Sequence, residues 1–250
     1  MQARPKPSPL IISKIIGHRG ACHFAPENTL ASLRKAQELG ASWIEFDAML
    51  TADGTAIVMH DETLDRTTNG HGLVAKTKYA QIAQLDAGDW FAPQFMGEKV
   101  PTVLEFLALA EQLRLGVNLE IKPTEQKDIE TAASIMQLLQ HYGFDQRLKI
   151  LISSFSLKSL AIARAIDSSL PLGLILNQWF AGWEESLLQL NCVSLGVNYK
   201  ILTEQKVQEI RNLGCLVLAY TVNDRSVAER LYSWGVNSVF SDNLLMDRFN

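Results

Sequence analysis

The feature that most restricts the fold is a regular alternation of short apolar runs with segments of helical periodicity, which extends over nearly the whole chain. Most runs are rich in leucine and β-branched residues without clean polar alternation, as expected of strands buried on both faces. We predict strands at 14–18, 43–50, 56–60, 116–122, 148–154, 172–176, 192–197, 215–222 and 237–241.

Three of the intervening segments carry start and stop signals for helices. "ENTLASLRKAQELG" ends at Gly40, "TEQKVQEIRNLG" at Gly214 and "NDRSVAERLYSWG" at Gly235. In each, a Thr, Asn or Asp near the start can cap the helix, and the glycine can take the left-handed position after it. Alternating strands and helices predict parallel strands joined by right-handed crossovers. Eight such units in 250 residues predict a closed (β/α)8 barrel, the TIM barrel, in the α/β class.

Residues 62–101 interrupt this rhythm, since they are rich in turn-forming and aromatic residues. A structureless loop of that length is unusual, so we predict a small loop-rich insertion after the second strand region. The segment is not a low-complexity linker, and the chain has no internal repeat. We therefore expect one domain over residues 1–250, with the insertion at about 62–101.

Composition excludes several classes of function. The net charge is −4 and no long basic run occurs, so nothing supports bulk nucleic-acid binding. Three cysteines without CxxC spacing argue against a disulfide framework or a zinc knuckle, and we expect Cys192 and Cys215 to be buried. The apolar pieces at 10–12 and 15–16 are too short for a signal peptide or a membrane span. We expect a cytoplasmic protein without stable membrane insertion.

Ionisable residues end four successive predicted strands, where the active sites of such barrels lie. They are His18 with Arg19, Glu45 with Asp47, His60 with Asp61, and Glu120 with Lys122. The chain has no GxSxG, GxGxxG or GxxxxGK[ST] motif, so neither a serine hydrolase of that type nor those nucleotide sites find support.

The carboxylates at these strand ends predict a metal site. Alternate residues of a strand face the same side, so Glu45 and Asp47 point together, and Glu120 shares its side with Lys122. Three buried carboxylates beside one lysine leave a net negative charge, which a divalent cation would balance. Oxygen ligands favour Mg²⁺ or Ca²⁺ over Zn²⁺. The alternative is that each carboxylate forms only a structural ion pair, such as Glu120 with Lys122.

His18 and His60 are the candidates for proton transfer, because a histidine can accept or donate a proton near neutral pH. Arg19 and Lys122 supply the positive charge that a phosphate requires. A lone histidine at a strand end is more often structural, but these two lie beside other ionisable groups. The other three, His23, His71 and His141, lack such neighbours.

Several stretches resemble, in the same order, the glycerophosphodiester phosphodiesterase family. "GHRGACHFAPENTLAS" resembles its His-Arg-Gly and Pro-Glu-Asn-Thr opening. "GASWIEFDAMLTADGTAIVMHDETLDRTTNGHG" resembles the next stretch, with its Glu-x-Asp, His-Asp and Arg-Thr-Thr-Asn-Gly motifs. "LDAGDWFAPQFMGEKVPTVLEFL" resembles the family insertion, "NLEIKP" supplies the third acid and the lysine, and "GVNSVFSDNL" resembles the closing strand. The resemblance covers residues 15–245.

The resemblance implies a TIM barrel like that of the phosphatidylinositol-specific phospholipases C, and hydrolysis of a glycerophosphodiester to sn-glycerol 3-phosphate and an alcohol. It implies a metal on Glu45, Asp47 and Glu120, acid–base roles for His18 and His60, and phosphate contacts from Arg19 and Lys122. The family often has Trp-Thr-Val-Asn on its seventh strand, whereas this chain has Tyr220 in "YTVN". Tyr220 therefore keeps an aromatic wall of altered shape in the substrate pocket. We also expect Glu27 either to hydrogen-bond His18 or Arg19, or only to cap the first helix, for which Asn28 and Thr29 are the main candidates.

The expected mechanism passes through a cyclic phosphate, formed by attack of the substrate's own glycerol 2-hydroxyl. We favour His18 as base and His60 as acid, although the sequence leaves the assignment open. One alternative is a phospholipase-D-like lyase that releases the cyclic phosphate, and another is an inactive barrel that binds a phosphorylated metabolite. The alcohol head group, the metal and the oligomeric state, with a homodimer as one option, are left open.

Overall fold

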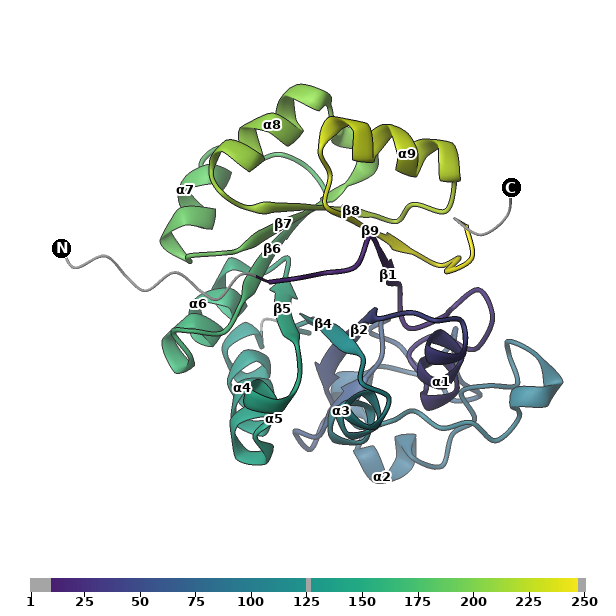
Figure 1. Cartoon of the computed structure of the whole chain (residues 1–250). Coiled ribbons are helices and arrows are strands. Elements are labelled where there is room, and N and C mark those ends of the chain that lie inside the picture. Colours follow the sequence, from purple (N-terminus) through teal and green to yellow (C-terminus); the bar gives the residue numbers. More distant parts are fainter. Residues whose placement is uncertain (1–9, 125–126, 247–250) are drawn as a thin grey trace.

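The computed structural model describes residues 10–124 and 127–246. Its main feature is a ring of parallel strands, in which β1 pairs with both β9 and β2 and so closes the sheet (Figure 1). The barrel strands are β1 (Ile15–Gly17), β2 (Trp43–Leu50), β4 (Gly116–Ile121), β5 (Ile150–Ser154), β6 (Leu172–Leu176), β7 (Ser194–Asn198), β8 (Leu216–Tyr220) and β9 (Ser238–Ser241). The predicted (β/α)8 barrel is therefore confirmed.

Helices cover the outside of the barrel, as Figure 1 shows for α7, α8 and α9 on one side and α1, α3 and α4 on the other. The longer helices are α1 (Leu30–Glu38), α3 (Val103–Gln112), α4 (Asp128–Tyr142), α6 (Leu157–Ile166), α7 (Trp183–Gln189), α8 (Glu204–Asn212) and α9 (Arg225–Trp234). A short α5 (Phe144–Arg147) follows α4, and a 3-10 turn, η3 (Tyr199–Ile201), follows β7.

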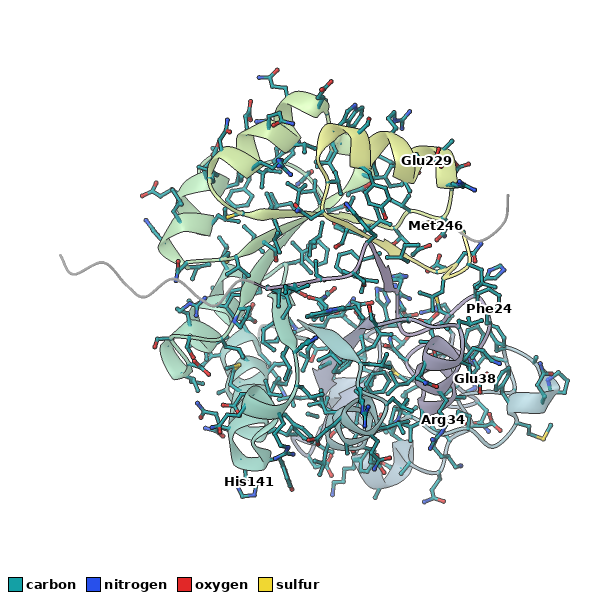
Figure 2. All side chains as sticks on the ribbon, in the orientation of Figure 1. Phe24, Arg34, Glu38, His141, Glu229 and Met246 are labelled. Carbon is teal, nitrogen blue, oxygen red and sulfur yellow. The ribbon has the colours of Figure 1, made fainter. Side chains whose placement is uncertain are left out.

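The predicted helix signals are confirmed at α1, α8 and α9. Thr29, Thr203 and Asp224 cap the three N-termini by accepting a backbone N–H. Gly235 has a φ of +101° at the end of α9, and the glycines after α1 and α8 are also left-handed, a backbone conformation that most other residues resist. His141 lies in the last turn of α4, at the periphery of the molecule (Figure 2).

The third predicted strand is not a barrel strand. β3 (Ala56–Val58) pairs antiparallel with the last residues of β2, with Ala48 opposite Val58 and Leu50 opposite Ala56. β2 thus extends beyond the barrel rim into a hairpin, and β3 returns toward the rim. His60 lies at the carboxyl end of the barrel, as expected, but it follows the antiparallel strand β3 of this hairpin and not a barrel strand.

The segment that follows β3 is rich in loops, as predicted for the insertion. It contains only short helical elements, namely η1 (Val74–Lys76), α2 (Tyr79–Ile82) and η2 (Pro93–Phe95). Its apolar side chains form a small separate core with one face of the hairpin, built from Met49, Ile57, Met59, Leu64, Val74, Ile82, Ala87 and Val100.

The two faces of β2 explain why polar groups reach the barrel interior. Ile44, Phe46 and Ala48 point outward into the main core, where Phe46 stacks on Phe106 of α3 at 4.5 Å between ring centroids. The alternate residues point inward, and Trp43 belongs to an apolar cluster inside the barrel. A Cβ on Gly116 would lie 2.5 Å from the Trp43 ring, so this position requires glycine. The interior is therefore apolar near the start of β2 and polar at its carboxyl end.

The predicted burial of Cys192 and Cys215 is confirmed. Cys192 and Cys215 are buried, all three cysteines are free thiols, and Cys22 is half-buried near β1. Within residues 10–124 and 127–246, no helix combines the length and apolar character needed to cross a membrane.

Candidate active site

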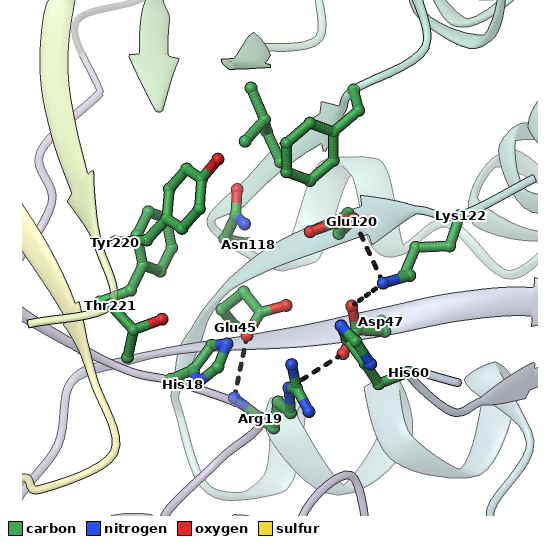
Figure 3. A pocket seen from close by; sticks show the side chains of 13 residues that line it. His18, Arg19, Glu45, Asp47, His60, Asn118, Glu120, Lys122, Tyr220 and Thr221 are labelled. Atoms are coloured by element: carbon green, nitrogen blue, oxygen red, sulfur yellow. Dashed lines mark hydrogen bonds and ion pairs between the residues drawn. The ribbon is translucent and has the colours of Figure 1, made fainter. Parts of the chain in front are cut away.

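A cavity of about 220 Å³ opens at the carboxyl end of the barrel (Figure 3). One side of its lining is ionisable, and the other is aromatic or aliphatic. The lining residues are His18, Arg19, Glu45, Asp47, His60, Asn118, Glu120, Lys122, Phe155, Ile175, Tyr220, Thr221 and Phe240. The structure thus brings together eight of the nine predicted site residues, and Glu27 lies behind this lining.

Three buried carboxylates meet at the floor of the cavity. Glu45 and Asp47 come from β2 and Glu120 comes from β4, where Asp47 is directly opposite Glu120 in the parallel register. One oxygen of each lies within 4.8 Å of the others. Burial raises the pKa of Glu45 well above its usual range, and the neighbouring Asp47 and Glu120 raise it further. Burial and Asp47 likewise raise the pKa of Glu120, to about 8.

This cluster suits a divalent cation with oxygen ligands. Among the described residues, the buried Oε1 of Glu45 has no hydrogen-bond partner, while its Oε2 accepts from the backbone N–H of Arg19 at 2.9 Å. An orphaned carboxylate oxygen inside an acidic cluster is costly unless a cation neutralises it. Mg²⁺ and Ca²⁺ prefer such oxygen ligands.

Two cations flank the acidic cluster. Nε of Arg19 lies 3.6 Å from Oδ2 of Asp47, and Nζ of Lys122 lies 3.6 Å from its Oδ1. Lys122 also lies 3.9 Å from Glu120, which is the ion pair considered as the structural alternative. These distances leave Glu45 without a salt bridge in the described part of the chain, so ion pairing alone does not balance the cluster.

In each of the two histidines, Nδ1 forms a hydrogen bond with the carboxylate of an aspartate. Nδ1 of His18 is 2.6 Å from Oδ1 of Asp242, in the loop after β9. Asp242 also accepts from Sγ of Cys22 at 3.0 Å and from Nδ2 of Asn223 at 2.6 Å. Burial alone would raise the pKa of Asp242, but the hydrogen bonds from His18 and Cys22 bring it well below its usual value. A carboxylate in this position orients the imidazole ring.

His60 has the equivalent arrangement on the other side of the cavity. Its Nδ1 is 2.6 Å from Oδ1 of Asp61. Burial lowers the pKa of His60; the charge of Asp47 opposes this, and those of Arg19 and Lys122 add to it. The pKa of Asp61 is held far below its usual value, mainly by hydrogen bonds from Arg66.

Glu27 contacts Arg19, one of the two partners expected for it. Nη1 of Arg19 donates to Oε1 of Glu27 at 2.7 Å. The α1 N-terminus is capped by Thr29, whose Oγ1 accepts from the N–H of Ser32 at 3.2 Å. The carboxylate of Glu27 therefore holds the arginine, and capping does not account for it.

Three polar residues that contribute to the site were not predicted as site residues from the sequence. Asn28, predicted only as a cap, has a φ of +58° and donates from Nδ2 to Oδ2 of Asp47 at 2.9 Å. Asn118 lies two residues before Glu120 and so shares its face of β4, a signal that could have identified it. Asp242 is 224 residues from His18, and no local pattern links the two.

The opposite wall of the cavity is apolar. Phe155 and Tyr220 meet edge to face, with ring centroids 6.0 Å apart. The hydroxyl of Tyr220 donates to the backbone carbonyl of Leu176 at 2.8 Å. The ring of Tyr220 therefore lines the pocket, while its additional hydroxyl is used in joining β8 to β6.

Comparisons with known proteins give one family. Residues 18–246 match the sequence model of the Glycerophosphoryl diester phosphodiesterase family. A glycerophosphodiester phosphodiesterase of Bacillus subtilis (strain 168) is 36% identical over 246 residues, and the match covers 91% of this chain and 82% of that protein. A protein of the same name from Caldanaerobacter subterraneus subsp. tengcongensis is 34% identical, with 91% and 93% covered.

The fold is similar to a solved structure of an Oleispira antarctica phosphodiesterase in complex with the product sn-glycerol-3-phosphate. The two share 39% sequence identity with a TM-score of 0.91, over 95% of this chain and 96% of that one. A glycerophosphodiester phosphodiesterase from Agrobacterium tumefaciens has a TM-score of 0.78 at 29% identity, with 95% and 100% covered.

Proposed function

The chain belongs to the glycerophosphoryl diester phosphodiesterase family and is an enzyme of this class, and from this premise we propose how its site hydrolyses glycerophosphodiesters. The products are sn-glycerol 3-phosphate and an alcohol, and a divalent cation, Mg²⁺ or Ca²⁺, assists. The observation that carries the proposal is the meeting of two carboxylate-bound histidines, two cations and three buried carboxylates around one cavity.

Glu45, Asp47 and Glu120 would hold the cation. When bound, it supplies positive charge that stabilises the negative charge developing on the phosphoryl oxygens. The orphaned Oε1 of Glu45 and the all-oxygen donor set support this use of the three residues.

Arg19 and Lys122 bind the phosphodiester anion. Both line the cavity, and both already face the acidic cluster at 3.6 Å from Asp47. Cations fixed in a partly buried cavity stabilise a developing negative charge more strongly than they would in bulk water.

The two histidines exchange protons with the substrate. His18 removes the proton of the glycerol 2-hydroxyl, and this oxygen bonds to phosphorus to form a cyclic phosphate. The bond from phosphorus to the alcohol oxygen breaks, and His60 donates a proton to that oxygen. Water then opens the ring with the roles reversed: His60 takes a proton from water, and His18 returns its proton to the 2-oxygen.

The partners of the two histidines support their use in proton transfer. The carboxylate of Asp242 contacts Nδ1 of His18 and is otherwise bound, among the described residues, only by the neutral donors Cys22 and Asn223. Asp61 contacts Nδ1 of His60 and accepts from Arg66, while burial lowers the pKa of His60. Each carboxylate orients its ring at the cavity, and we assign His18 as base and His60 as acid.

The proposal is tested with purified protein treated with a chelator and assayed against several glycerophosphodiesters. Mg²⁺ and Ca²⁺ are added back separately, and the phosphorus-containing products are followed by ³¹P NMR. We expect activity to return with at least one cation and sn-glycerol 3-phosphate to accumulate. A cyclic phosphate as the final product would indicate a phospholipase-D-like lyase instead. Binding of glycerol 3-phosphate without turnover of any diester would indicate an inactive binding barrel.

A further inference from the structure

Arg66 lies in the loop after β3, at the start of the "RTTNG" segment, and its guanidinium bridges two carboxylates. Nε and Nη2 donate to Asp61 at 2.6 and 2.9 Å, while Nη1 and Nη2 donate to Glu27 at 2.8 Å each. Both carboxylates are thus held by a two-point contact. The arginine itself is not among the residues that line the cavity in the described part of the chain.

Each of these carboxylates contacts a residue that does line the cavity. Oδ1 of Asp61, which accepts from Arg66, is 2.6 Å from Nδ1 of His60. Oε1 of Glu27, which also accepts from Arg66, accepts from Nη1 of Arg19 at 2.7 Å. The guanidinium of Arg66 is therefore linked through one carboxylate to His60, the proposed proton donor. Through the other carboxylate it is linked to Arg19, a proposed phosphate ligand.

We propose that Arg66 is a positioning residue that fixes His60 through Asp61 and Arg19 through Glu27, and so couples the insertion loop to turnover. The inference rests on the proposed function, since it assigns Arg66 to the same reaction. Two acidic and two basic side chains balance in this network. Without Arg66, Glu27 keeps Arg19 as its only ionic partner among the described residues, which draws the arginine toward Glu27 and away from the phosphate. Asp61 also becomes free to rotate, which releases the ring of His60.

The contact differs from an ordinary surface ion pair. Exposed pairs contribute little to stability because water screens them and flexible side chains lose entropy. Here the Arg66 side chain is 43% exposed, but its partners Glu27 and Asp61 are only 11% and 25% exposed. The planar fork of a guanidinium can hold two carboxylates by two points each, whereas a lysine ammonium offers no such geometry.

The test compares Arg66→Ala and Arg66→Lys with wild type in the metal-reconstituted assay, with thermal unfolding measured on each protein. Displacement of catalytic groups by a fraction of an ångström to 1 Å costs up to about 100-fold in rate, so we expect kcat to fall about 10- to 100-fold in both variants. We expect the unfolding temperature to stay close to that of wild type. Millimolar guanidinium or methylguanidinium should then partly restore kcat of Arg66→Ala in a saturable manner.

The chain provides a matched control in Arg147, which binds Glu111 at two points, at 2.6 and 3.2 Å, and is 50% exposed. Arg147→Ala removes the same functional group from a comparable surface pair, so its kcat should equal that of wild type and should not respond to guanidinium. Arg66→Lys retains the charge, which separates the loss of the fork from the loss of charge.

The outcomes distinguish failure of the positioning role of Arg66 from failure of the proposed function. An active wild type with Arg66→Ala within about twofold of its kcat overturns the positioning role alone. A loss of activity that follows a lowered unfolding temperature, without rescue by guanidinium, also overturns it in favour of a purely structural role. A wild type that turns over no glycerophosphodiester with any added cation overturns the proposed function and this inference together.

Discussion

Replacement of Glu120 by glutamine should stabilise the chelator-treated protein while abolishing its response to the metal. In the absence of a cation, burial and Asp47 raise the pKa of Glu120 to about 8, against 4.5 for an ordinary glutamate. The folded protein therefore retains a proton that the unfolded chain releases between these pH values. Because the folded-state pKa is raised, stability is highest at low pH in this window and falls as pH rises toward 8.

The size of the effect follows from the width of this window. At about 1.4 kcal/mol for each pH unit, the charge on Glu120 costs the metal-free protein on the order of 5 kcal/mol above pH 8, and correspondingly less at pH 7. This is a large share of the roughly 5–15 kcal/mol by which folded domains are usually stable. Glutamine keeps the shape of the side chain without the charge, so Glu120→Gln should show a smaller decline over the same range, with the remainder due to Glu45, whose pKa burial also raises.

The assay is urea denaturation in the presence of a chelator at pH 5, 7 and 8.5, repeated with Mg²⁺ and Ca²⁺. We expect Glu120→Gln to be more stable than wild type at pH 8.5 and similar at pH 5, and only wild type to gain stability from the cation. Glu184→Gln, on the exposed surface of α7, is the control for a general loss of negative charge. A chelator-treated wild type of constant stability from pH 5 to 8.5, or a variant less stable than wild type at pH 8.5, would refute the reasoning.

Four further predictions concern the same site. His18→Ala and His60→Ala should each lower kcat at least about 100-fold without unfolding the protein, and near-normal turnover by either would remove that histidine from proton transfer. Glu45→Ala should abolish metal-dependent activity, and calorimetric titration should detect no restoration of binding at any concentration of added metal. Asp242→Asn should lower kcat about 10- to 100-fold, because a neutral amide cannot stabilise the protonated ring as a carboxylate does; a change in KM alone would contradict this. Tyr220→Phe should cost about 1 kcal/mol in denaturant unfolding but leave kcat close to wild type, since only a hydrogen bond to a backbone carbonyl is lost.

Patterns within one strand were readable from the sequence because side-chain direction alternates there. The inward pair Glu45 and Asp47 and the outward Phe46 follow from this alternation alone, and the structure has the same pattern. Asn118 could have been found by the same rule. The hairpin of β3 could not, because a short apolar run gives no sign of whether it pairs parallel or antiparallel with its neighbour.

The sequence by itself determined the barrel class, the ends of three helices and the ionisable residues that line the cavity, because these depend on local periodicity, capping and the common direction of parallel strands. Only the tertiary structure decided which side chains hold these cavity residues in place. Asp242 meets His18 because β9 closes the ring beside β1, and Arg66, in the loop after β3, meets Glu27, which is 39 residues earlier in the chain. Such contacts join segments far apart in the chain, and their distances depend on how the whole barrel packs. No local pattern encodes them.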